Sequence, residues 1–111
     1  MRDLINFAIM TDNNSRNLPQ LRTTVRVPEH VLMRQVGEEL VLLNVDKENY
    51  YGLNPVGARL MQLAETGATL EEIVERMLTE FEVKREQLEA DVRTVAADLI
   101  AAGLLEDGAA R

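Results

Sequence analysis

Acidic side chains are the most frequent groups in this sequence that could do chemistry. Carboxylates are paired at Glu71-Glu72 and stand on both sides of Phe81, at Glu80 and Glu82. Two carboxylates can act as general acid and general base when a concave site shifts the pKa of one of them. Adjacent residues of a helix point in different directions, and nothing in the sequence indicates a concave site. We therefore predict that these acids lie on solvated helix faces.

The other groups that enzymes use are scarce. There is no cysteine, which excludes thiolate nucleophiles, disulfides and zinc held by cysteine. The single histidine, His30, excludes a site with several histidine ligands and is predicted to be an exposed loop residue. Gly52 and Gly57 lack the Lys-Ser/Thr ending of a phosphate-binding loop. The sequence thus predicts a protein that is not an enzyme, with no catalytic residues, cofactor or metal.

Charge and length restrict the class of protein further. The 111 residues carry a formal net charge of −7 and are 46% hydrophobic, enough for one modest core. An acidic chain is a poor match to DNA, because neutralising phosphates supplies most of the affinity of DNA-binding proteins. No apolar run approaches the ~20 residues needed to span a bilayer, and the start lacks the features of a signal peptide. We expect a cytoplasmic protein with no nucleic acid or membrane partner.

Three strands are predicted in the first half of the chain. Residues 31–36 form one strand, and residues 40–45 are an almost continuous apolar run, typical of a central strand buried on both faces. The third strand, Tyr50 to Leu53, is very short and leads directly to Asn54 and Pro55, a good N-cap and a good first helical residue. Alternation along this strand should point one tyrosine toward the core and the other outward. A short strand of this kind is a candidate sheet edge, which can hold an extended peptide.

Three helices are predicted to follow, over about 55–65, 70–81 and 85–102. The second begins with a capping box at Thr69 and Glu72, and its apolar residues follow the helical spacing as far as Phe81. The predicted fold class is α+β: a three-stranded antiparallel β-meander followed by three α-helices, in a winged helix-turn-helix-like arrangement.

The chain is divided into three parts by composition. Residues 1–24 are predicted to be a flexible extension, residues 25–106 the domain, and residues 107–111 a disordered tail. The extension carries an apolar cluster whose role the sequence leaves open between packing on the domain, pairing with a second copy and an artefact of the start site. The members of this cluster are Leu4, Ile5, Phe7, Ala8, Ile9 and Met10.

From Pro28 to Leu105 the sequence resembles the PqqD-like family, the leader-peptide recognition domains of ribosomal-peptide biosynthesis. The most specific part of the resemblance runs from Glu39 to Ala58. The matching residues are Glu39, Leu42-Leu43, Tyr50-Tyr51-Gly52-Leu53-Asn54, Gly57-Ala58, Thr69, Glu72-Ile73, Leu88, Asp91-Val92, Leu99 and Gly103-Leu104-Leu105.

The resemblance implies a non-catalytic adaptor that binds the leader of a precursor peptide as a strand added to the third strand, in a groove against the third helix. It implies delivery of the precursor to a modifying enzyme, a radical-SAM protein or a leader peptidase and cyclase. The strand side of the implied peptide-binding site is Tyr50, Tyr51 and Leu53, and the helix side or its support is Leu88, Asp91, Val92, Val95 and Leu99. Leu18-Pro19-Gln20-Leu21 resembles part of a leader motif, which suggests that the extension could occupy the open edge of its own chain or of a neighbouring copy.

Two other expectations remain open at this stage. The alternative function is a winged-helix DNA-binding transcriptional regulator, although the outward positions of the helix over 70–81 are mostly glutamates. An open edge strand also favours a homodimer formed by edge pairing or exchanged strands.

Overall fold

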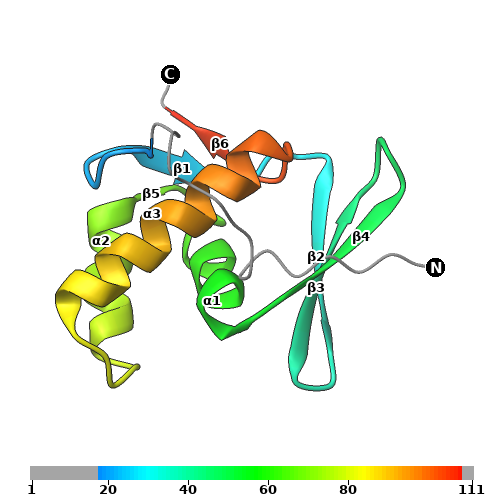
Figure 1. Cartoon of the computed structure of the whole chain (residues 1–111). Helices are drawn as coiled ribbons and strands as arrows, with labels where there is room; N and C mark the ends of the chain where they lie inside the picture. Colours follow the sequence, from blue (N-terminus) through cyan, green and yellow to red (C-terminus); the bar gives the residue numbers. More distant parts are fainter. Residues whose placement is uncertain (1–17, 109–111) are drawn as a thin grey trace.

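In the computed structural model, residues 18–108 are described and form two small sheets and three helices (Figure 1). The elements in chain order are β1 (Thr24–Arg26), β2 (Val31–Val36), β3 (Glu39–Asn44), β4 (Asn49–Leu53), α1 (Pro55–Leu63), β5 (Ala68–Thr69), α2 (Leu70–Leu78), α3 (Arg85–Ala101) and β6 (Glu106–Asp107). The β2–β3–β4 sheet lies at one side of the molecule and the helices at the other (Figure 1). The predicted α+β class, with a three-stranded antiparallel meander followed by three helices, is confirmed.

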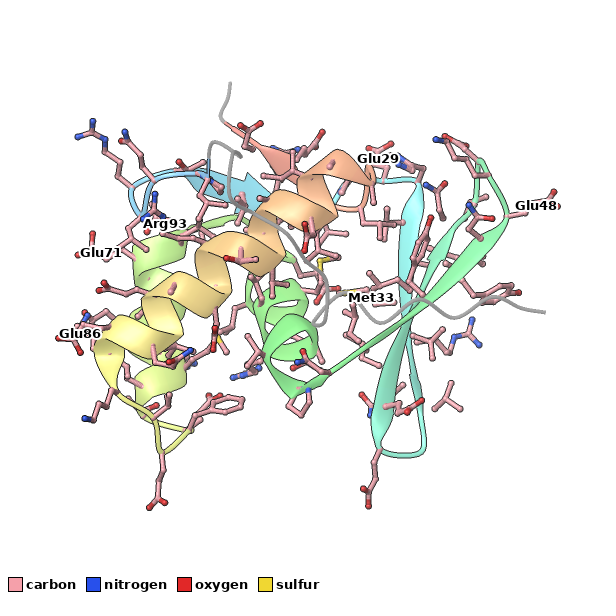
Figure 2. All side chains as sticks on the ribbon, viewed as in Figure 1. Glu29, Met33, Glu48, Glu71, Glu86 and Arg93 are labelled. Carbon is pink, nitrogen blue, oxygen red and sulfur yellow. The ribbon has the colours of Figure 1, made fainter. Side chains whose placement is uncertain are left out.

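The β2–β3–β4 meander has one face toward the helices and one face away from them. Its register pairs Leu42 with both Met33 and Tyr51, so these three side chains share the helix-facing side. Leu42 is fully buried there, and Figure 2 shows Met33 pointing from the sheet toward the helices. This face is therefore the one that closes the hydrophobic core.

The opposite face of β3 corrects one prediction. Val41 and Leu43 were expected to be buried, because the run over 40–45 is apolar at almost every position. They are only half-buried, since the helices cover a single face of the sheet. The expectation of a strand buried on both faces is wrong within residues 18–108, and an apolar outer face results.

The helices begin where the caps predict. The Asn54 side chain accepts a hydrogen bond from the Gly57 N–H at 2.9 Å, and Pro55 is the first residue of α1. At α2, Thr69 accepts from the Glu72 N–H at 3.0 Å while the Glu72 carboxylate accepts from the Thr69 N–H at 2.9 Å, which completes the capping box. Lys84, before α3, makes no side-chain cap. Local sequence thus determines the first turns of α1 and α2.

The second sheet, in the order β5–β1–β6, has no counterpart among the predicted elements. Its strands are two or three residues long, too short to show a period in the sequence. Val25 at its centre is fully buried. The predicted boundary between residues 24 and 25 falls inside β1, and Asp107 of the predicted tail lies in β6.

The loop before β1 completes the start of α2. The N–H groups of the first helical turn have no partner within a helix. Here the Leu70 N–H donates to the Thr23 carbonyl at 3.0 Å, and the Glu71 N–H donates to the Leu21 carbonyl at 2.7 Å. Residues 21–23 are thus joined to the domain by backbone hydrogen bonds.

Replacing Thr69 with alanine should destabilise the protein by about 1 kcal/mol, because the Glu72 N–H loses its acceptor at the helix start. The matched control is Thr66→Ala, in the exposed turn before β5, which removes no side-chain hydrogen bond. Urea unfolding of both variants measures the difference, and equal midpoints would contradict the role assigned to the capping box.

α2 ends earlier than its apolar spacing predicts. The helix stops at Leu78, and Phe81 lies half-buried beyond it, with its N–H bonded to the Met77 carbonyl at 2.8 Å. Two hydrogen bonds from the Arg59 guanidinium, at 2.7 and 2.8 Å, hold the Glu80 carboxylate toward α1. These hydrogen bonds lower the pKa of Glu80 below its ordinary value. The contact joins α1 to the turn that follows α2.

The end of α3 has a Schellman motif. Gly103 has φ +78°, its N–H donates to Ile100, and the Leu104 N–H donates to the Leu99 carbonyl at 2.9 Å. Leu104 and Leu105 are buried as a result. The predicted return of these leucines onto the helix end is confirmed.

Candidate functional site

β4 is a terminal strand of its sheet. The strand order is β2–β3–β4, and within residues 18–108 β4 pairs with β3 alone. Its register with β3 runs from Asn49 opposite Asn44 to Leu53 opposite Leu40. The chain passes directly from β4 into Asn54, the N-cap of α1. The C-terminal end of β4 is therefore held next to α1.

The two adjacent tyrosines of β4 point to opposite faces of the sheet. Tyr51 is 7% exposed and lies in the core, while Tyr50 is 51% exposed on the outer face. The Tyr51 hydroxyl accepts a hydrogen bond from the Asn49 side-chain amide at 3.3 Å. Leu53 follows Tyr51 on the core side and is also buried. The prediction of one inward and one outward ring is confirmed.

Four of the five α3 residues implied as the helix side of the site are core residues. Leu88, Val92, Val95 and Leu99 are at most 5% exposed and belong to the same hydrophobic cluster as Tyr51 and Leu53. Side chains this buried can support a neighbouring surface but offer little area to a ligand. The structure therefore places them beneath any surface formed by α3.

The fifth residue, Asp91, is half-buried and accepts a hydrogen bond from the Gln87 side chain at 3.1 Å. Thr94 and Asp98 follow at the spacing that puts residues on one helix face. Thr94 is half-buried and Asp98 is only 7% exposed. Sequence reasoning did not include Thr94 or Asp98 in the site, although a polar stripe at intervals of three and four beside the apolar stripe was a signal for them.

Arg93 marks the opposite flank of α3. Its guanidinium donates to the Pro19 carbonyl at 2.8 Å, and Figure 2 shows it on the side of the helix near the loop before β1. With Leu21 bonded to Glu71, residues 18–21 lie against α2 and α3. The suggestion that the Pro-Leu unit occupies the edge of β4 in its own chain is therefore wrong for these residues. Binding to the edge of a neighbouring copy stays a prediction, and residues 1–17 lie outside the described part of the chain.

His30 is half-buried and has a structural contact. Its Nε2 lies 3.0 Å from the Gly103 carbonyl at the end of α3, which ties the turn before β2 to the helix. The prediction of a simple exposed loop residue is therefore corrected.

Among residues 18–108, no group of three or more His, Asp or Glu side chains is arranged to hold a metal ion. Within the same range, none of the helices has the length and apolar character that crossing a membrane requires.

Comparison with known proteins gives a family and two similar structures. The family model described as Coenzyme PQQ synthesis protein D (PqqD) matches residues 39–105. No curated protein matches the chain.

One solved structure, described as TbiB1 in complex with the TbiA(beta) leader peptide, is 35% identical, covers 78% of this chain and 99% of its own, and superposes with a TM-score of 0.68. A second, described as lasso peptide synthetase B1 complexed with the leader peptide, is 22% identical, covers 73% of this chain and 95% of its own, and has a TM-score of 0.60; it supports the fold. Because the family model spans more than half of the sequence and the described fold agrees with it, the chain belongs to the PqqD family.

Proposed function

We propose that this protein is a non-catalytic adaptor that binds the leader segment of a ribosomally synthesised precursor peptide. The observation that carries the proposal is the place of β4 at the end of its sheet, in a chain 35% identical to a protein solved with a leader peptide. The leader would add to the sheet as a strand beside β4. Hydrogen bonds between backbone groups would supply the affinity, and pockets for leader side chains would supply the specificity for one leader sequence.

We infer the helix side of the proposed groove from the rotation of α3. Arg93 faces the loop before β1, and Asp91, two residues earlier, points to nearly the opposite side of the helix. We assign the stripe of Asp91, Thr94 and Asp98 to the groove side of α3. Asp91 and Thr94 are half-buried and would contact the leader, Asp91 by pairing with a cation, whereas Asp98 is buried and would support them. The buried residues Leu88, Val92, Val95 and Leu99 support this stripe from beneath.

On the strand side, alternation separates two roles. Tyr51 and Leu53 face the helices, so they would form the floor under the leader side chains that point inward. Tyr50 faces outward and would contact the leader side chains on the other face of the extended sheet.

The adaptor would present the bound precursor to a modifying enzyme, a radical-SAM protein or a leader peptidase and cyclase. Leader binding would compete with a homodimer formed through the same edge, because one strand edge holds one partner at a time. The DNA-binding alternative receives no support from the comparisons, and the exposed positions of α2 include Glu71, Glu72 and Glu75. Acidic side chains there would repel phosphates.

The test is a titration of the full chain with two peptides, the TbiA(beta) leader and the leader of the precursor encoded beside this chain. We expect saturable binding of at least one of them, with backbone amide shifts in NMR spectra concentrated at Tyr50 to Leu53. The absence of saturable binding by both peptides, together with unchanged amide signals in β4, would refute the proposed function.

A further inference from the structure

The outer face of the β2–β3–β4 sheet is apolar, and no helix among residues 18–108 covers it (Figure 1). The register sets Tyr50 beside Leu43 and Leu32 in one row across the three strands. Tyr50 is 51% and Leu32 46% exposed. A shallow hollow of about 190 Å³ on this face, which we call the outer patch, is lined by Leu32, Arg34, Val36, Val41, Leu43 and Tyr50. Contiguous exposed apolar side chains of this kind mark interaction sites.

Gly52 leaves a gap in this face at the open edge of the sheet. Because Gly52 lies two residues after Tyr50, the two share the outer face. The row next to that of Tyr50 runs from Arg34 through Val41 to Gly52, so β4 contributes no side chain there. Tyr50 is accordingly the residue of β4 that borders the outer patch.

The backbone of β4 does not require a glycine at position 52. The φ angle of Gly52 is not positive, in contrast to those of Gly37 and Gly103. The pairing of β4 with β3 runs from Asn49 to Leu53 without a bulge. A glycine inside a regular strand weakens the strand, and it often marks a place where a ligand or another chain approaches closely. The space above Gly52 therefore points to a partner that uses it.

The backbone groups of Gly52 face the open edge. The Val45 N–H donates to the His30 carbonyl at 2.9 Å, and this bonded pair fixes the alternation of hydrogen bonds along β3. Residues 39, 41 and 43 of β3 therefore face β2, while residues 40, 42 and 44 face β4. Their partners on β4 are residues 53, 51 and 49, which leaves the N–H and carbonyl groups of Tyr50 and Gly52 pointing away from β3. A strand added beside β4 would bond to these two residues.

We propose that the leader residue paired with Gly52 carries an aromatic side chain, which lies across Gly52 and into the outer patch. This inference rests on the proposed function, because it requires a leader strand beside β4. A residue directly opposite Gly52 has its side chain on the face of the sheet that Tyr50 occupies. An aromatic ring on one strand can cover a glycine of the neighbouring strand and offset the loss of packing there.

The distances across the sheet favour a long, flat side chain. Neighbouring strands are about 4.8 Å apart, so the backbone of the leader lies about 10 Å from that of β3. A small side chain does not cross this interval, whereas an aromatic ring covers Gly52 and reaches Val41. Arg34 lines the outer patch beyond Val41 and makes no ion pair with any residue of the range 18–108. A cation at this place favours an aromatic ring over an aliphatic chain.

NMR spectra of the full chain test the proposal with the two peptides of the function test, the TbiA(beta) leader and the leader of the precursor encoded beside this chain. NOEs between the two strands at the α protons of Gly52 identify the leader residue that is paired with it. We expect this residue to be aromatic, with its ring current moving the outward α proton of Gly52 upfield. Replacing the residue with alanine should weaken binding about tenfold, the size expected when an aromatic contact is lost.

Gly52→Val fills the same space from the protein side. Valine is favoured in strands, so the urea midpoint should not fall, whereas binding of the unmodified leader should weaken about tenfold. The leader with alanine at the paired position should bind the original chain and the variant alike, because the ring that valine displaces is already absent. Thr24→Val, at an exposed position of β1 in the other sheet, is the matched control and should leave binding unchanged.

Two results would overturn the proposal and leave the proposed function standing. One is a small or polar leader residue opposite Gly52 in a peptide that binds with amide shifts at Tyr50 to Leu53. The other is an equal loss from Gly52→Val for the aromatic and the alanine forms of the leader. The absence of saturable binding by both peptides would refute the proposed function and this inference together.

Discussion

Leu60→Ala is expected to destabilise the domain by about 2–5 kcal/mol, enough to remove much of the stability of a small domain. Leu60 is fully buried on α1, the helix that contacts β3, β4, α2 and α3. Truncation leaves a cavity that these elements can fill only partly, because each is also held in place by its other contacts. Urea unfolding followed by circular dichroism measures the loss as a lower midpoint at an unchanged slope.

The matched control is Leu63→Ala, the same substitution one turn later on α1. Leu63 is only half-buried, so its loss should cost about 1 kcal/mol. A similar midpoint for the two variants would show that the core is not centred on α1 as described.

Methylation of backbone nitrogens in the leader should produce the largest effect on binding. In an added strand, alternate N–H groups point to the neighbouring strand. A methyl group on one that faces β4 removes a hydrogen bond, leaves a carbonyl of β4 unsatisfied and adds bulk. We expect binding to weaken about tenfold or more for each such position, corresponding to about 1.4 kcal/mol. Isothermal titration calorimetry with the full chain measures it.

The control peptide carries methyl groups on the intervening nitrogens, which would point away from β4. It should bind with nearly the affinity of the unmodified leader. An equal loss for both sets would show that the leader does not bind as a strand, while binding itself, measured with the unmodified peptide, would still stand.

The sequence alone determined the order and most bounds of the larger elements. Helix starts were predictable because caps such as Asn54 and Thr69 act on backbone groups within three residues. The opposite directions of Tyr50 and Tyr51 were predictable because strand geometry alternates side chains between faces. The resemblance carried by the string around these tyrosines was also local, and the family match confirms it.

Features that depend on distant residues required the tertiary structure. The β5–β1–β6 sheet joins strands too short to show a period, and these strands come from segments far apart in the sequence. α2 ends at Leu78, earlier than its apolar spacing predicts, and Glu80 beyond its end is bonded to Arg59 on another helix. The apolar run of β3 predicted burial on both faces of the sheet. The sequence of one strand does not show whether helices cover one face or both.

In the candidate site too, local features were predictable from the sequence and features that depend on packing were not. Sequence placed the strand side on β4, because a short strand next to a helix cap can be recognised locally. The helical spacing of the apolar residues of α3 predicts that they face inward, and the burial of Leu88, Val92, Val95 and Leu99 confirms this. The sequence did not determine which neighbouring positions of α3, such as Asp91 and Thr94, face the strand side. Helical periodicity specifies which residues share a face, but only packing against the other elements decides which direction that face points.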